Sequence, residues 1–246
     1  MTALLTLDRV RRVHGETVIL DDVSFAVEEG RFITLFGPNG CGKTTLMNIL
    51  TGVDTPSGGT LHGAESVRGH IGFVFQDYRR TLLPWRSGRE NILLPLRLRG
   101  MDRREQIRRL DRLVAKMNPD FDLHQRIYTL SGGQAQMIGL MRALIIEPRL
   151  LILDEPFSAL DYGRTLAYRQ LIMTVARDFN LTTLFISHDL EEALYLGDEV
   201  IFLTAKPTRV REVMTIPFPR HREPSLLGTP AFAALKLKGL ANVELA

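Results

Sequence analysis

The glycine-rich segment 37–45, Gly-Pro-Asn-Gly-Cys-Gly-Lys-Thr-Thr, constrains this chain more than any other feature, because it lies between a predicted buried strand (31–36) and a predicted helix (43–50). Glycines permit backbone conformations that turn successive N–H groups inward towards phosphate oxygens, and the start of the helix adds a positive dipole. At such a loop the Lys43 ammonium reaches the β- and γ-phosphates, and the Thr44 hydroxyl ligates Mg²⁺. A plain turn would not require lysine and threonine at these positions. The predicted ATP-binding loop consists of Gly37, Pro38, Asn39, Gly40, Cys41, Gly42, Lys43, Thr44 and Thr45.

A second polar pair follows the apolar run Leu-Leu-Ile-Leu at 150–153. A strand of a parallel sheet that ends in two acids places them at the edge where ligands of open α/β folds bind. We expect Asp154 to hold Mg²⁺ and Glu155 to accept a proton from the attacking water, a contribution of about 10²–10⁴-fold in rate. The alternative, a solvated turn after a strand, loses weight because the phosphate loop lies upstream.

The remaining pattern is that of an α/β protein. Short strands are predicted at 4–10, 17–20, 23–27, 60–62 and 71–75, and the region 86–118 is rich in Arg and Leu with apolar residues at helical spacing. Of these, Ile107, Leu110, Leu113, Val114 and Met117 are expected in the core. After a helix at 133–146, strands (150–154, 182–187, 199–203) alternate with helices (164–178, 189–195), which favours a parallel sheet covered by helices.

We therefore predict a single domain over 1–246, in which 1–82 and 150–215 form an α/β core with an antiparallel β part. A helical insertion occupies 83–149. Residues 216–246 contain several prolines and are predicted to be an extended tail that includes a short helix from Pro230 onwards.

Composition excludes several classes of protein. With 45% apolar and 24% charged residues the chain is an ordinary globular protein, and its net charge of +3 comes from interspersed charges, which favours a solvated surface over a nucleic-acid site. Its single cysteine forms no internal disulfide and fits a reducing compartment. The first residues lack the pattern of a signal peptide, and no apolar run approaches the length of about 18 residues that a membrane span needs. Any action at a membrane is expected to require a partner.

The segment Leu130-Ser-Gly-Gly-Gln134, placed between the phosphate loop and the acidic pair, resembles the signature sequence of the ABC ATPases. The resemblance covers about residues 1–215. It implies a P-loop NTPase (RecA-like) core with a parallel sheet, a small antiparallel β subdomain and an inserted helical subdomain. It also implies ATP hydrolysis, with ATP and Mg²⁺ as cofactors.

Other family motifs follow in the expected order. Gln76 resembles the glutamine of the Q-loop, which contacts Mg²⁺ or water, and His188 resembles the switch histidine, which contacts the γ-phosphate; both are expected to be catalytic. A surface glutamine and a structural histidine are the alternatives. Asp161, in Ser158-Ala-Leu-Asp161, resembles the D-loop aspartate.

The signature motif also predicts a second anion site from its own residues. Ser131 is a candidate N-cap, and the two glycines after it expose N–H groups at a helix start. In the family this site faces the ATP bound by a second copy arranged head to tail, so that two chains enclose the nucleotides. The residues expected to act in trans are Ser131, Gly132, Gly133, Gln134 and Asp161.

Two departures from the family pattern concern nucleotide affinity and coupling. His14 stands where the family usually has an aromatic residue that stacks on adenine, and imidazole offers less area for stacking. Ala135 and Met137 replace residues that are commonly basic in the signature helix, whereas Gln136 and Arg142 remain. Neither change removes a catalytic group.

The segment Phe75-Gln-Asp-Tyr-Arg-Arg-Thr-Leu-Leu-Pro-Trp85, followed by Asn91-Ile92, resembles the branch of importers for nitrate, sulfonates and taurine, although importers of a thiamine precursor share it. The resemblance implies a peripheral subunit on the cytoplasmic face of the membrane, with multi-spanning permease subunits and, indirectly, a solute-binding protein as partners. Trp85 is a candidate for the permease docking groove. A non-transport ABC ATPase acting on ribosomes or DNA, and a module that only senses ATP, are the alternatives.

Overall fold

The computed structural model describes residues 2–157 and 162–243. Its internal contacts divide the chain into two compact units. The first unit comprises Met1–Gly69 and Ala176–Ala246, and the second comprises His70–Val175. The fold is α/β, and each unit is described by itself below.

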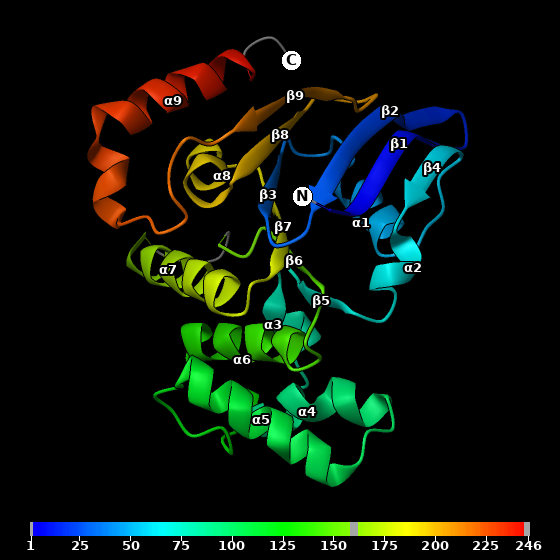
Figure 1. Cartoon of the computed structure of the whole chain (residues 1–246). Coiled ribbons are helices and arrows are strands. Elements are labelled where there is room, and N and C mark those ends of the chain that lie inside the picture. Colours follow the sequence, from blue (N-terminus) through cyan, green and yellow to red (C-terminus); the bar gives the residue numbers. More distant parts are fainter. Residues whose placement is uncertain (1, 158–161, 244–246) are drawn as a thin grey trace. The chain divides into compact units, whose positions relative to one another are not determined.

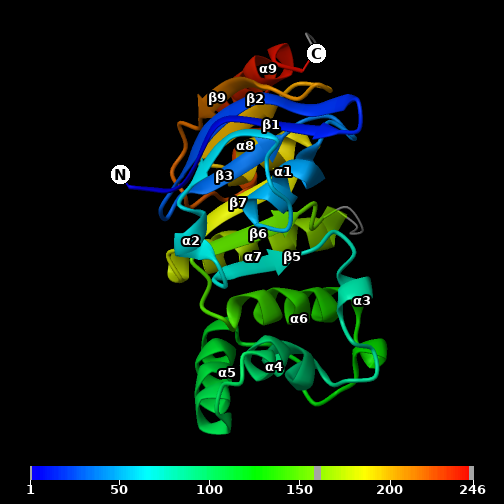
Figure 2. The ribbon, with the colours of Figure 1, turned by 90° about the vertical axis from the view of Figure 1, so that its right-hand side faces the viewer.

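An antiparallel sheet in the order β2-β1-β4 begins the first unit. The strands β1 (Ala3–His14) and β2 (Thr17–Glu28) form a long hairpin (Figure 2). The strand β4 (Gly58–His62) pairs with the other side of β1 (Figure 1). The sequence prediction of separate strands at 17–20 and 23–27 is wrong, because both belong to β2. The ladder contains register shifts, and Asp22 has a positive φ of 58°, so the apolar alternation breaks while the pairing continues.

The other strands of the first unit lie in the order β7-β3-β8-β9. The strands β3 (Phe32–Phe36), β7 (Thr182–Ser187) and β8 (Glu199–Leu203) are parallel, and β9 (Val210–Thr215) is antiparallel to β8. All side chains of β3 and β7 are buried, as expected for strands covered on both faces. The predicted strands 182–187 and 199–203 are confirmed.

The helices of the first unit are α1 (Lys43–Leu50), α2 (Ala64–Val67), α8 (Leu190–Leu196), the 3₁₀ turn η2 (Pro224–Gly228) and α9 (Pro230–Ala241). The predicted helix from Pro230 is confirmed as α9, and the 3₁₀ turn η2 before it was not predicted. Thr229 caps this helix by accepting a hydrogen bond from the N–H of Phe232, and Pro230 suits its first position. The tail returns along the first unit, where α9 lies beside α8 (Figure 1).

Two parallel strands, β5 (Ile71–Val74) and β6 (Leu150–Asp154), belong to the second unit. Its helices are α3 (Tyr78–Thr81), α4 (Gly88–Leu98), α5 (Arg103–Met117), the 3₁₀ turn η1 (Ile127–Thr129), α6 (Gly132–Leu144) and α7 (Tyr162–Asp178), whose last residues fall in the first unit. Within the second unit α6 packs against α4. No helix in the described part of the chain is long and apolar enough to span a bilayer.

The predicted core stripe of α5 is confirmed only in part. Leu110, Leu113 and Met117 are buried, and Val114 is half-buried, whereas Ile107 is 36% exposed. The spacing of apolar residues shows which face of a helix is apolar. It does not show how much of the length of that face neighbouring elements cover. Ile107, near the start of α5, was therefore placed wrongly in the core.

Candidate functional site

The segment 37–42 connects β3 to α1, as predicted. Gly40 and Gly42 have positive φ angles of 76° and 113°, and a Cβ at Gly42 would lie 3.0 Å from Cγ2 of Ile19. Glycine is therefore required at position 42 by both conformation and space. The Lys43 side chain is only 8% exposed, and its Nζ donates to the carbonyl oxygens of Gly37 (2.8 Å) and Pro38 (3.1 Å). The loop thus curls around its own lysine.

Thr208 supports the loop by hydrogen bonding to its backbone, and the sequence analysis missed this residue. The buried hydroxyl of Thr208 donates to the carbonyl oxygen of Cys41, and the N–H of Thr208 donates to the carbonyl oxygen of Ile19 (2.9 Å). Cys41 points inward, and burial raises the pKa of its thiol above the ordinary value. Because Thr208 is distant in sequence and belongs to no motif, only its Lys206-Pro-Thr-Arg209 context could have drawn attention to it.

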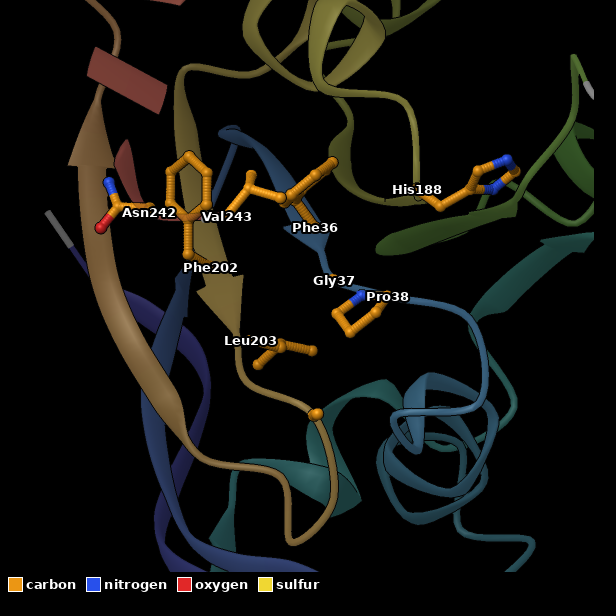
Figure 3. Close-up of a pocket in the computed structure, with 9 residues that line it drawn as sticks. Phe36, Gly37, Pro38, His188, Phe202, Leu203, Asn242 and Val243 are labelled. Carbon is orange, nitrogen blue, oxygen red and sulfur yellow. The ribbon is translucent and has the colours of Figure 1, made fainter. Parts of the chain in front are cut away.

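Strand order places His188 near the start of the loop. The strands β3 and β7 are parallel neighbours with Phe36 opposite Ser187, so Gly37 and His188 leave the sheet at the same edge. Gly37, Pro38 and His188 line one cavity of about 310 Å³, together with Phe202 from β8 (Figure 3). The imidazole of His188 is exposed. The first unit thus brings together two of the predicted elements, the phosphate loop and the histidine.

In the second unit, Gln76 and the acidic pair meet at the carboxyl ends of β5 and β6. The amide nitrogen Nε2 of Gln76 donates to Oε2 of Glu155 at 3.1 Å. Glu155 has a φ of 42°, a left-handed conformation that costs a non-glycine residue energy and is concentrated at functional sites. Both Asp154 and Glu155 are half-buried, so the surrounding protein restricts their carboxylates while leaving them accessible to solvent.

The signature residues form the start of α6. The hydroxyl of Ser131 accepts from the N–H of Gln134 (3.3 Å), and the side chain of Gln134 accepts from the N–H of Ser131 (2.9 Å), which confirms the predicted N-cap as a capping box. A Cβ at Gly133 would meet no atom of the described residues within 4 Å. Ala135, one of the departures, is buried.

Gln136 lies one residue further along α6 and connects it to the acidic pair. Its side chain is buried and donates to the carbonyl oxygen of Pro156 (3.0 Å), the residue after Glu155. His14 lies exposed at the end of β1, beside the hairpin turn. Asp161 lies outside the described residues.

The donor atoms suit magnesium. Mg²⁺ prefers oxygen ligands and keeps several waters or phosphate oxygens, so it needs only one or two protein ligands. The Thr44 hydroxyl, the Asp154 carboxylate and the amide oxygen of Gln76 are all of this type. Among the described residues no cluster of three or more His, Cys, Asp or Glu could hold a metal by itself.

A phosphate loop after a central parallel strand, a histidine at the next strand end, an acidic pair after β6 and a capped Ser-Gly-Gly turn together define an ATP-binding cassette ATPase. The family model for ABC transporters matches residues 20–158. The chain belongs to this family.

Three relatives are similar over most of their length. The chain is 35% identical to the aliphatic sulfonates import ATP-binding protein SsuB of Bacillus licheniformis, over 93% of this chain and 88% of the relative. It is 37% identical to the taurine import ATP-binding protein TauB of Yersinia pestis (81% and 79%). Identity to the bicarbonate transport ATP-binding protein CmpD of Synechococcus elongatus is 36% (89% and 82%).

Solved structures agree with the fold. The dimeric bacterial ABC transporter cassette MJ0796 has a TM-score of 0.72 and 26% identity, covering 87% of this chain and all of the cassette. The same cassette in a post-hydrolysis state, bound to ADP and phosphate, has a TM-score of 0.71. The chain is accordingly an ATP-binding ABC subunit and an ATPase.

Proposed function

We propose that this chain is the motor subunit of an ABC importer, in which binding and hydrolysis of Mg-ATP drive separate transmembrane subunits. The observation that carries the proposal is that the sulfonate and taurine relatives are named import ATP-binding proteins, and the chain covers most of each. These names favour transport over the alternative of an ABC ATPase acting on ribosomes or DNA. We also propose one ATPase domain over 1–246, with its helical insertion at 83–149.

The chemistry is assigned to residues of both units. Glu155 accepts the proton of the attacking water. Gln76 orients the Glu155 carboxylate through the hydrogen bond that it donates to it. His188 contacts the γ-phosphate, and Lys43 moves from its own loop carbonyls to the β- and γ-phosphates. Thr44, Gln76 and Asp154 would hold Mg²⁺, which would neutralise phosphate charge. His14 stacks on the adenine with its exposed ring.

The second copy supplies the remaining contacts. The open start of α6 presents the N–H groups of Gly132 and Gly133 to an anion, with Ser131 and Gln134 locked in the capping box. Among the described residues, nothing lies within 4 Å of a Cβ at Gly133, which suits the γ-phosphate of an ATP held by a partner. Asp161 is assigned to the same interface. The dimeric cassette among the solved structures supports a head-to-tail homodimer.

The proposed solute is a small anion or zwitterion of the sulfonate, taurine, nitrate or bicarbonate kind, delivered by a solute-binding protein to multi-spanning permease subunits. The chain itself sits at the cytoplasmic face of the membrane. The second unit offers apolar side chains for the permease, since Trp85 is 64% exposed and Tyr128 and Leu98 are exposed as well. Nucleic acid is not a partner in this proposal.

Replacement of Glu155 by glutamine tests the catalytic assignment. Because the amide cannot take the proton, Glu155→Gln should lower ATP turnover by about 10²-fold or more. The variant should still bind ATP and keep it bound. The variant should therefore elute as an ATP-dependent dimer in size-exclusion chromatography. The control Glu65→Gln makes the same change at an exposed glutamate of α2 and should behave like the wild type. Unchanged turnover in Glu155→Gln would remove Glu155 from the role of base.

Affinity purification from gently solubilised native membranes tests the transport assignment. A multi-spanning subunit together with a solute-binding protein is the expected result, and the binding protein can then be screened with sulfonates, taurine, nitrate and bicarbonate. Recovery of ribosomes, or of DNA with repair proteins, would contradict the importer and leave only the ATPase.

A further inference from the structure

The helix that follows His188 is too short to hold its own position. Leu190–Leu196 of α8 makes two turns, and isolated helices of this length are not stable in water. Its N-terminus is capped by Asp189, whose carboxylate accepts from the N–H of Glu192 (3.0 Å), but no basic residue lies in its last turn. The position of α8 must therefore be set by its neighbours.

Both residues beside His188 are bound to the first turn of α8. The hydroxyl of Ser187 donates to the buried carboxylate of Glu192 (2.8 Å) and accepts from the N–H of Asp189 (3.0 Å). Since these bonds enclose the backbone of His188, a shift of α8 is transmitted to the imidazole.

The tail holds the other end of α8 through Arg222, which is 2% exposed. The guanidinium donates to the carbonyl oxygens of Tyr195 (2.7 Å) and Gly197 (2.9 Å) at the end of the helix, and to that of Pro219 (2.9 Å) in the tail. The Tyr195 hydroxyl donates back to the carbonyl oxygen of Arg222 (2.8 Å). Terminal carbonyls carry partial negative charge, so Arg222 supplies from the tail the cation that α8 lacks.

The tail helix α9 makes a second attachment to α8 (Figure 1). The Lys236 ammonium lies 3.1 Å from Oε2 of Glu191. Gly239 lies against Leu190, because a Cβ at position 239 would be 3.0 Å from Cδ1 of that leucine. The tail thus contacts α8 at its first turn as well as at its last.

We propose that the tail segment 216–243 is a brace that positions His188 through α8, with Arg222 and the Lys236–Glu191 pair as positioning residues for ATP hydrolysis. This inference rests on the proposed role of His188 at the γ-phosphate. Loss of an attachment should lower kcat for ATP and leave KM nearly unchanged, because the phosphate loop is not altered.

A charge exchange in the full-length chain tests the brace without touching the buried core. Lys236→Glu places two carboxylates together and should lower kcat roughly 2- to 5-fold, with KM for ATP within about twofold. The double variant Glu191→Lys/Lys236→Glu restores the attraction and should restore kcat. Lys238→Glu makes the same charge change on an exposed position of α9 and should leave kcat at the wild-type value.

A second variant, Arg222→Lys, keeps the charge but loses the planar fork. It should lower kcat roughly tenfold, and a thermal shift on adding ADP reports whether the variant is folded. If Arg222→Lys does not fold, the kcat values of Lys236→Glu and of Glu191→Lys/Lys236→Glu test the brace by themselves. Wild-type kcat in Lys236→Glu, a rise in KM alone, or failure of the double variant to recover would overturn the brace.

His188→Ala separates this proposal from the one it rests on. If His188→Ala retains wild-type kcat, the assigned role of His188 is wrong and the brace falls with it. If His188→Ala lowers kcat but the tail variants do not, only the brace is wrong.

Discussion

Asn91, in the first turns of α4, is fully buried and holds the segment 83–87 against the helix. Its Oδ1 accepts from the N–H of Leu83 (2.8 Å), and its Nδ2 donates to the carbonyl oxygens of Leu83 (3.1 Å) and Ser87 (3.0 Å). Asn91→Ala removes all three bonds. At about 1 kcal/mol for each net hydrogen bond, the variant should lose about 3 kcal/mol of unfolding free energy.

Trp85 makes this loss measurable, because it is the single tryptophan of the chain and lies two residues from Leu83. Urea unfolding followed by Trp85 fluorescence should show a midpoint lower by about 1.5 M, for an m-value of about 2 kcal/mol per M. Arg97→Ala, at an exposed position of the same helix, is the control and should change the stability by less than about 0.5 kcal/mol.

Asn91→Asp adds a test of sign. The new carboxylate would be buried and would face two carbonyl oxygens, so its pKa in the folded state should rise above that of the unfolded chain. The penalty should therefore be larger at pH 8 than at pH 5, where the protonated acid can donate a hydrogen bond again. If Asn91→Ala matched Arg97→Ala, or if Asn91→Asp were independent of pH, the three hydrogen bonds would not stabilise this segment as argued.

Three further predictions follow from burial and close contacts. Cys41 is buried and burial raises the pKa of its thiol, so N-ethylmaleimide should label the folded chain at pH 7.5 much more slowly than the urea-unfolded chain, as followed by mass spectrometry; equal rates would contradict this. Burial, followed by nearby carboxylates, raises the pKa of Glu199. Glu199→Gln should therefore raise Tm clearly at pH 8 and much less at pH 4, where the carboxyl is mostly protonated in both states. The same gain in Tm at both pH values would refute this cause. A Cβ at Gly72 would lie 2.5 Å from the carbonyl oxygen of Ala143, so Gly72→Ala should lower the free energy of unfolding by about 1–3 kcal/mol. Gly133→Ala, with no described atom within 4 Å of the added Cβ, should keep the wild-type Tm and lose ATP turnover. If Gly133→Ala were the less stable variant, the close contact at Gly72 would not set the stability.

Much of the site could be predicted from the sequence, because its chemistry is local. A loop that cradles phosphate needs glycines, a lysine and a threonine within nine consecutive positions, between a strand and a helix. The capping box at Ser131 and Gln134 is likewise formed by residues three apart. The buried strand at 150–154 was visible for the same reason, because Leu-Leu-Ile-Leu is a short continuous apolar run.

The remainder depends on contacts between distant parts of the chain. Strand order alone places His188 beside Gly37, because β7 pairs with β3 in parallel although about 150 residues separate them. The hydrogen bond from Gln76 to Glu155 likewise requires β5 and β6 to be neighbours. No local pattern in the sequence specifies which of these short buried strands are neighbours in the sheet.

The supporting residues show the same division. In the sequence, no motif contains Thr208 or Arg222. In the structure both side chains are buried, and each is hydrogen-bonded, Thr208 to the loop and Arg222 to the end of α8. The sequence by itself predicted which groups are proposed to bind and cleave ATP, because phosphate chemistry dictates their types and spacing. Only the tertiary structure decided which distant segments hold those groups in place, because burial and strand pairing depend on the whole chain at once.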